Sequence, residues 1–184
     1  DLEGILKAIL SADHYSRFIT AQNLDFSYEH KSGARLRGNA FIQQGKFVIV
    51  LRLVPHVKTL SELNLPASLA DFARKRQGFF LVVGPVGQGK SATMAAMVSL
   101  INEERQSHIL TIEDPVEYVY EQKKSIIDQR EVGIDTPDFA DALKSAFRQD
   151  VNVILIGEMR NTETIATAVT AAETGHLVLS TLHT

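Results

Sequence analysis

The stretch Gly84-Pro85-Val86-Gly87-Gln88-Gly89-Lys90-Ser91 decides the fold class of this chain. It fits the pattern G-x-x-x-x-G-K-[ST], in which glycines let backbone N–H groups turn inward towards phosphate oxygens. The lysine adds a positive charge between phosphates, and the serine hydroxyl completes a Mg²⁺ shell. The alternative is a glycine-rich turn that precedes a lysine by chance, but here an apolar run comes before the motif and a helical pattern follows it. We therefore expect a P-loop that binds ATP and Mg²⁺ through Gly84, Pro85, Val86, Gly87, Gln88, Gly89, Lys90, Ser91 and Ala92.

Strand-like and helical patterns alternate around and after this motif. Strands are expected at 79–83, 108–112, 153–157 and 177–182, and helices at 90–104, 139–147 and 162–173. The first of these strands, Phe79 to Val83, is apolar throughout, as expected of a strand that is buried on both faces. Strands that alternate with helices are typical of a mostly parallel sheet. The predicted fold class is α/β.

A different pattern precedes residue 55. Apolar residues recur at helical spacing in 2–10 and again around 15–19, and from residue 23 the period changes to two. Strands are expected at 24–28, 36–41 and 47–54, joined by short turns. This predicts a small antiparallel sheet with helices before it. We place a linker at 55–60, between domains at 1–54 and 61–184.

Composition excludes several classes of protein. The 184 residues carry a net charge of −3, which argues against a nucleic-acid binder. Cysteine is absent, which excludes disulfides and thiolate metal sites. No apolar run approaches the ~20 residues of a membrane span, so direct membrane insertion is not expected. Because the chain starts inside a helical pattern and stops as a strand emerges, we expect it to be a fragment.

Acids follow two of the predicted strands. Glu113 and Asp114 come after 109–112, and Glu158 comes after 153–157. Hydrolysis needs one group to orient or deprotonate water and another to hold the metal, and we expect both at the end of a strand neighbouring the P-loop strand. Each acid taken alone is as readily a solvated loop residue. His176 and His183 flank the last strand, and we expect them to sense phosphate.

Four blocks in order resemble the secretion ATPases of type II secretion and type IV pili. They are the Walker A motif at 84–91, Ile-Glu-Asp-Pro-Val-Glu-Tyr at 112–118, Gly-Glu-Met-Arg at 157–160 and Thr-Gly-His-Leu-Val-Leu-Ser-Thr-Leu-His-Thr at 174–184. These correspond to the family's Walker A, Asp, Walker B and His boxes. The blocks 129–133 and 171–175 are more similar to the retraction ATPases than to the assembly ATPases. The blocks 24–28, 35–41 and 51–55 look like the family's PAS-like domain.

The resemblance implies a fold, an activity and partners. The fold would be a RecA-like P-loop ATPase core, incomplete at its C-terminus, after a small PAS-like α+β domain. The activity would be ATP hydrolysis driving type IV pilus retraction (twitching motility). The partners would be further copies in a homohexamer and the inner-membrane platform of the pilus machine, with the protein in the cytoplasm at the inner face of that membrane. The alternatives are an assembly or secretion ATPase of the same superfamily and a ring subunit that binds nucleotide but hydrolyses it weakly.

The resemblance also implies roles for individual residues. Glu113 and Glu158 would share water activation and Mg²⁺ organisation, with Ser91 as a second metal ligand, and His183 would approach the terminal phosphate. The arginines in matching blocks, as candidates to reach a neighbour's nucleotide, are Arg37, Arg52, Arg130 and Arg148. Three P-loop positions depart from the family's usual residues, Val86, Gln88 and Ala92, but they remove no backbone donor. Asp150-Val151-Asn152 also departs from the usual Asp-Pro-Asp before Walker B.

Overall fold

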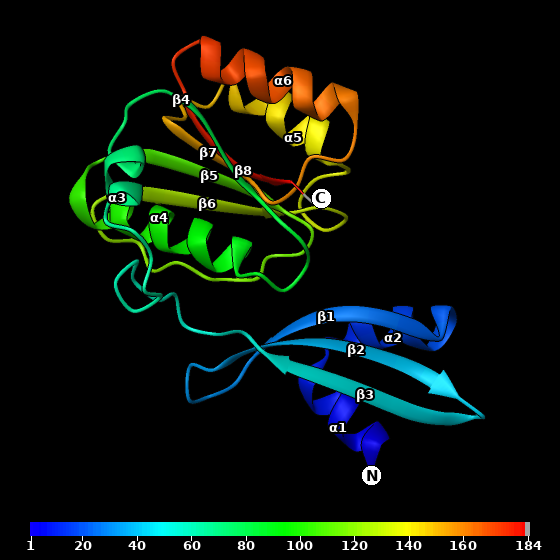
Figure 1. The fold of residues 1–184 in the computed structure, drawn as a ribbon. Helices are drawn as coiled ribbons and strands as arrows, with labels where there is room; N and C mark the ends of the chain where they lie inside the picture. Colours follow the sequence, from blue (N-terminus) through cyan, green and yellow to red (C-terminus); the bar gives the residue numbers. More distant parts are fainter. Residues whose placement is uncertain (183–184) are drawn as a thin grey trace. The chain divides into compact units, whose positions relative to one another are not determined.

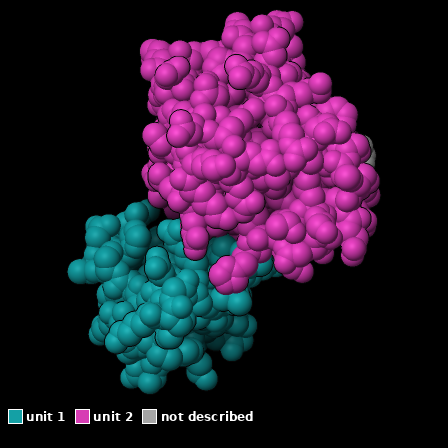
Figure 2. Space-filling model, turned by 90° about the vertical axis from the view of Figure 1, so that its left-hand side faces the viewer, with its two compact units in different colours: residues 1–55 teal, residues 56–184 magenta. Residues whose placement is uncertain are grey.

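The computed structural model describes residues 1–182 and divides into two compact units, Asp1–Pro55 and His56–Thr184 (Figure 2). Each unit has its own hydrophobic core. Within residues 1–182, no helix is both long and apolar enough to cross a membrane.

The smaller unit is a three-stranded antiparallel sheet with two helices. Its elements are α1 (Leu2–Ile9), α2 (Ala12–Ala21), β1 (Asn23–Glu29), β2 (Arg35–Gln43) and β3 (Lys46–Leu53), with strand order β1-β2-β3. The β2–β3 turn consists of Gln44 and Gly45, both at positive φ, which is the conformation that a two-residue hairpin needs. Gly38 in β2 makes room for the ring of Phe26, because a Cβ there would lie 2.2 Å from that ring. The small α+β domain expected from the sequence is therefore present.

The larger unit is built on a five-stranded parallel sheet. Its elements are α3 (Ser68–Ala73), β4 (Gly78–Val83), α4 (Lys90–Glu104), β5 (His108–Glu113), β6 (Ile126–Glu131), α5 (Phe139–Ala146), β7 (Val153–Ile156), α6 (Thr162–Glu173) and β8 (Leu177–Leu182). The strand order is β4-β8-β7-β5-β6. Figure 1 shows α3 and α4 on one face of the sheet and α5 and α6 on the other. The predicted α/β class is confirmed.

Alternation along the strands divides the core into two layers. Ile109 and Leu155 pack with α4 on one face, while Leu110 and Ile154 pack with α5 and α6 on the other. The central strands β5, β7 and β8 are buried on both faces, which agrees with their largely apolar sequences. The expectation that β4 is buried on both faces is wrong, because β4 is an edge strand in which Leu81 and Val83 are exposed. The C-terminal ends of the central strands lie at one edge of the sheet, together with the end of β4. Whatever follows these strands is therefore gathered along that edge.

Candidate active site

The predicted P-loop follows β4 directly and leads into α4. Gly87 and Gly89 have φ values of 82° and 80°, a left-handed conformation that a side chain would strain. Gly89 is the N-cap of the 15-residue helix α4, and no side chain among the described residues caps it. The first turn of a helix carries N–H groups without helical acceptors and the positive end of the dipole. This helix start is therefore suited to an anion such as a phosphate.

Lys90 lies beneath the P-loop. Its side chain is buried, and its Nζ donates to the carbonyl oxygens of Gly84 and Pro85, both at 2.8 Å. These two hydrogen bonds hold the ammonium group at the loop, where it would lie close to a bound phosphate. The residues present thus fit a nucleotide phosphate, and the exposed Ser91 follows on the same helix turn.

Glu113 ends β5 and is 8% exposed. Its Oε1 accepts a hydrogen bond of 2.7 Å from the Thr111 hydroxyl. Burial raises the pKa of Glu113 above its ordinary value, and the Thr111 hydrogen bond opposes that rise. A carboxyl group with a raised pKa is a better proton acceptor than an ordinary one. Thr111 is a residue that the sequence analysis did not single out.

Glu158 follows β7 after one intervening residue. Its side chain is 12% exposed, and its Oε1 lies 2.8 Å from Nε of Arg160. The two acid-bearing strands meet here, because the amide of Gly157 donates to Ile112 O at 2.8 Å. The structure therefore brings the ends of both predicted acidic segments together.

The strand order corrects one expectation. We expected the acids on a strand next to the P-loop strand, but β4 pairs with β8, and β7 and β5 lie further along the sheet. Strand β8 lies between β4 and β7, and Oγ1 of Thr181 in β8 donates to the carbonyl of Gly157 at 2.7 Å. Chain order does not determine strand order when parallel strands are joined by long crossovers, so this insertion was not visible in the sequence.

The two histidines have different outcomes. His183 lies outside the described residues. His176 precedes β8, and its Nδ1 lies 2.9 Å from the carbonyl of Ala171. It stands at the N-terminal end of that strand, beside Gly78, while the P-loop follows the opposite end of β4. The expectation that His176 senses phosphate is therefore wrong.

The four candidate arginines differ in their surroundings. Arg37 of β2 and Arg52 of β3 face each other in register, and within residues 1–182 neither pairs with a carboxylate. Arg130 donates to Ser145 Oγ at 2.9 Å and to the carbonyl of Asp135 at 3.0 Å. Arg148, just after α5, donates to the carbonyl of Lys144 at 3.4 Å. Two like charges opposite each other are unfavourable unless an anion joins them.

No cluster of three or more His, Cys, Asp or Glu side chains able to hold a metal is found in the described part of the chain. Mg²⁺ commonly binds through one or two carboxylates together with phosphates and water. The donor set Ser91 and Glu158 fits a metal of that kind, which depends on bound nucleotide.

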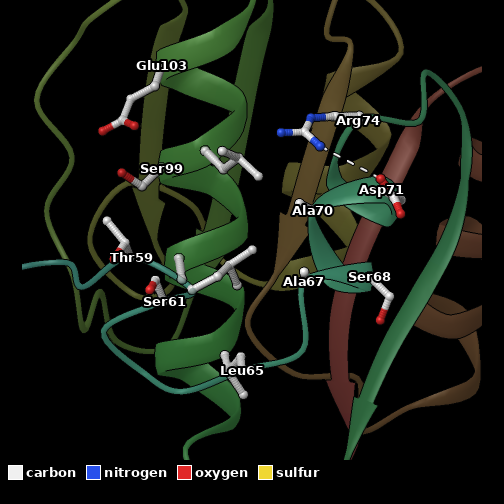
Figure 3. A pocket seen from close by; sticks show the side chains of 13 residues that line it. Thr59, Ser61, Leu65, Ala67, Ser68, Ala70, Asp71, Arg74, Ser99 and Glu103 are labelled. Atoms are coloured by element: carbon white, nitrogen blue, oxygen red, sulfur yellow. Dashed lines mark ion pairs between the residues drawn. The ribbon is translucent and has the colours of Figure 1, made fainter.

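A separate groove of about 660 Å³ lies along the flank of α4, away from the P-loop (Figure 3). It is lined by the turn around Leu65, by α3 and by the far half of α4, including Ser99 and Glu103. Arg74 and Asp71 pair at its rim, at 3.7 Å. None of the residues predicted for the nucleotide site lines this groove.

Comparison with known proteins agrees with the site. A model of the family described as Type II/IV secretion system protein matches residues 44–184. The twitching motility protein of Neisseria gonorrhoeae is 53% identical over 175 residues, which are 94% of this chain and 46% of that protein. The type IV pilus retraction ATPase PilT of Pseudomonas aeruginosa is 50% identical over 161 residues, which are 87% of this chain and 47% of that protein.

A solved structure is similar over almost all of the chain. The crystal structure of the pilus retraction motor PilT with bound ADP matches with a TM-score of 0.93 and 45% identity, covering 99% of this chain and 53% of that one. The resemblance predicted from the sequence blocks is confirmed. The chain spans about half the length of the curated relatives it matches.

Proposed function

Because this chain belongs to the family of type II/IV secretion system proteins, we propose that it is the nucleotide-binding part of an ATPase motor that drives type IV pilus retraction. The observation that carries the proposal is the placement of Lys90 and Glu113. A buried lysine lies under the P-loop, and a buried carboxylate ends a strand of the same sheet at the same edge. The relatives named for retraction and twitching motility support the direction of the motor.

Nucleotide binding is assigned to residues 84–92. Backbone N–H groups of the loop and the start of α4 hold the phosphates, and Lys90 supplies charge between them. Ser91 and Glu158 would hold Mg²⁺. The metal, when bound, neutralises charge that develops on the phosphate oxygens. His183 completes the set as a contact to the terminal phosphate, by resemblance to the family's His box.

Glu113 is assigned as the base. The oxygen of a water molecule forms a bond to the terminal phosphorus, and the bond from that phosphorus to the bridging oxygen breaks. ADP leaves with that electron pair, and Glu113 accepts the proton of the water. Burial suits Glu113 to this task, because it raises the pKa of the carboxyl group. Glu158, whose side chain is 12% exposed, is the second acid and helps to orient the water.

A second copy of the chain supplies the arginine. We assign this role to Arg37 or Arg52 rather than Arg130, whose guanidinium already bonds its own subunit. The opposed pair on β2 and β3 needs an anion, and a neighbour's terminal phosphate provides one. The assembly is a homohexamer in the cytoplasm, working on the inner-membrane platform of the pilus machine.

The test is made in cells that depend on the full-length protein. Cells that carry Lys90→Ala should still display pili but fail to retract them and fail to twitch. Lys75→Ala, which removes an exposed lysine of the same unit, is the matched control and should behave as wild type. Loss of surface pili with Lys90→Ala would instead identify an assembly ATPase, and normal twitching would refute the motor role.

A further inference from the structure

Thr111 places a hydroxyl group where the fold needs none. It lies inside β5 with 0% exposure, between Gln129 of β6 and Leu155 of β7 in register. The neighbouring position on the same face of β5 is Ile109, which packs in the core against α4. Valine has almost the same shape and high strand propensity, so packing alone would accept it. The hydroxyl therefore calls for an explanation beyond the core.

The hydroxyl is used by Glu113. Residues i and i+2 of a strand share a face, so Thr111 and Glu113 lie on the same side of the sheet as α4. The Oγ1 to Oε1 distance is 2.7 Å, which is typical of a strong O–H···O⁻ contact. Both residues are buried, so water competes little for this bond. One carboxylate oxygen of Glu113 is thereby held in place.

The chain that follows Glu113 has hydrogen bonds of its own, although the backbone of Glu117 and the side chain of Gln129 also act on the Glu113 carboxyl group and, like Thr111, oppose the rise of its pKa. Gln129, opposite Thr111 on β6, donates through Nε2 to the carbonyl of Tyr118 at 2.8 Å and accepts at Oε1 from the amide of Tyr120 at 3.1 Å. Asn102 of α4 binds the same segment further along, donating to the carbonyl of Glu121 at 2.7 Å. Loss of the Thr111 hydroxyl would therefore leave this segment in place, and its effect would be confined to the carboxylate.

We propose that Thr111 is a positioning residue, whose hydroxyl fixes the Glu113 carboxylate in one orientation for proton transfer from the attacking water. The proposal rests on the role of Glu113 proposed above. Thr111 keeps its own proton throughout and touches neither nucleotide nor water. A misplacement of about 1 Å at a reacting group can lower a rate by about 10²-fold, so a fixed orientation has a measurable effect.

The experiment compares Thr111→Val and Thr111→Ser in the full-length protein. Thr111→Val keeps the shape and removes the hydroxyl, and we expect kcat to fall by about ten- to a hundredfold. KM and the Kd for a fluorescent ATP analogue should stay within about twofold, because the P-loop is untouched. Thr111→Ser, which keeps the hydroxyl, should retain kcat within about threefold. Wild-type kcat in Thr111→Val, or equal losses in both variants, would overturn the proposal.

Two further variants keep the test decisive. If Thr111→Val fails to fold, Thr111→Ala is compared with Thr111→Ser, since both are smaller than threonine and differ by the hydroxyl. The double variant Glu113→Gln/Thr111→Val should be no slower than Glu113→Gln, because Thr111 acts through Glu113. A further loss in the double variant would contradict the proposal. Normal turnover of Glu113→Gln would refute the base itself, whereas a slow Glu113→Gln with a normal Thr111→Val would refute this inference alone.

Discussion

Gly157 lies against the backbone of Glu113, because a Cβ at position 157 would stand 3.3 Å from the Cα of Glu113 and 3.4 Å from the carbonyl oxygen of Ile112. The amide of Gly157 donates to that same carbonyl at 2.8 Å. The residue before the second predicted acid thus packs on the first one. The two acidic segments form one local structure, although they are far apart in the sequence.

The first prediction follows from this contact. Gly157→Ala must push the backbones at 113 and 157 apart by a few tenths of an ångström, since neither neighbouring atom belongs to a flexible side chain. We expect a loss of about 1–3 kcal/mol in the free energy of unfolding, and a lower kcat because Glu113 moves. Denaturant unfolding and phosphate release measure the two effects. A variant as stable and as active as wild type would show that the contact is loose.

Nucleotide affinity tests the role of Lys90. A charge-assisted contact to phosphate contributes on the order of 2 kcal/mol, so Lys90→Ala should weaken ATP binding by at least about 30-fold. Circular dichroism should remain unchanged, because the side chain bonds the carbonyls of Gly84 and Pro85 in the loop. Isothermal titration with MgATP makes the measurement, with Lys75→Ala as the control. An unchanged affinity of Lys90→Ala for MgATP would contradict the assignment of residues 84–92 as a nucleotide-binding P-loop.

The buried Glu113 also predicts a pH dependence of stability. Burial raises its pKa in the folded state, so the folded chain keeps the proton to higher pH than the unfolded chain. The favourable contribution is present at low pH and is lost as the pH rises through the folded pKa. Glu113→Gln cannot ionise, so its stability relative to wild type should increase from about pH 4 to about pH 8. A difference in unfolding free energy that stays constant or decreases over that range would contradict the raised pKa.

For the opposed arginines Arg37 and Arg52, we expect substitution to lower activity without lowering stability. Removing one of two like charges relieves repulsion, so Arg37→Ala and Arg52→Ala should leave thermal stability unchanged or slightly increased. At least one of them should lower turnover of the full-length protein by about 10³-fold, as expected for an arginine that stabilises the transition state. Arg17→Ala, an exposed position of α2, serves as control. Full turnover in both test variants would indicate that Arg130 or Arg148 is the arginine that reaches the neighbour's nucleotide.

Local features of the fold were predictable because their causes are local. The P-loop glycines mark the start of α4 at Lys90, and the Gln44-Gly45 turn marks the β2–β3 hairpin. By contrast, neither α3 nor β6 was predicted from the sequence. The helix α3 is only six residues long, too short to show a clear helical pattern. Strand β6 is an edge strand in which Ile127 is buried while Asp128 is exposed, so its sequence lacks the apolar run of a central strand.

Features that depend on packing between distant segments were not predictable. The insertion of β8 beside β4 sets the distance from the P-loop strand to both acids, and nothing in the order of the motifs encodes it. The error at His176 was avoidable, because a residue that precedes a strand of a parallel sheet lies at the opposite edge from a P-loop that follows its strand. Thr111 was not predicted because it lies among apolar residues in the sequence. Its importance depends on the burial of Glu113 and on the hydrogen bond between the two side chains.

The most direct test of the account is turnover by Glu113→Gln and Glu158→Gln in the full-length protein. Each change keeps the shape of the side chain and removes its charge, so both variants should still bind ATP but release phosphate at near-background rates. Glu121→Gln, an exposed acid of the segment after Glu113, should hydrolyse normally. Wild-type phosphate release by Glu113→Gln and Glu158→Gln would contradict the proposed active site.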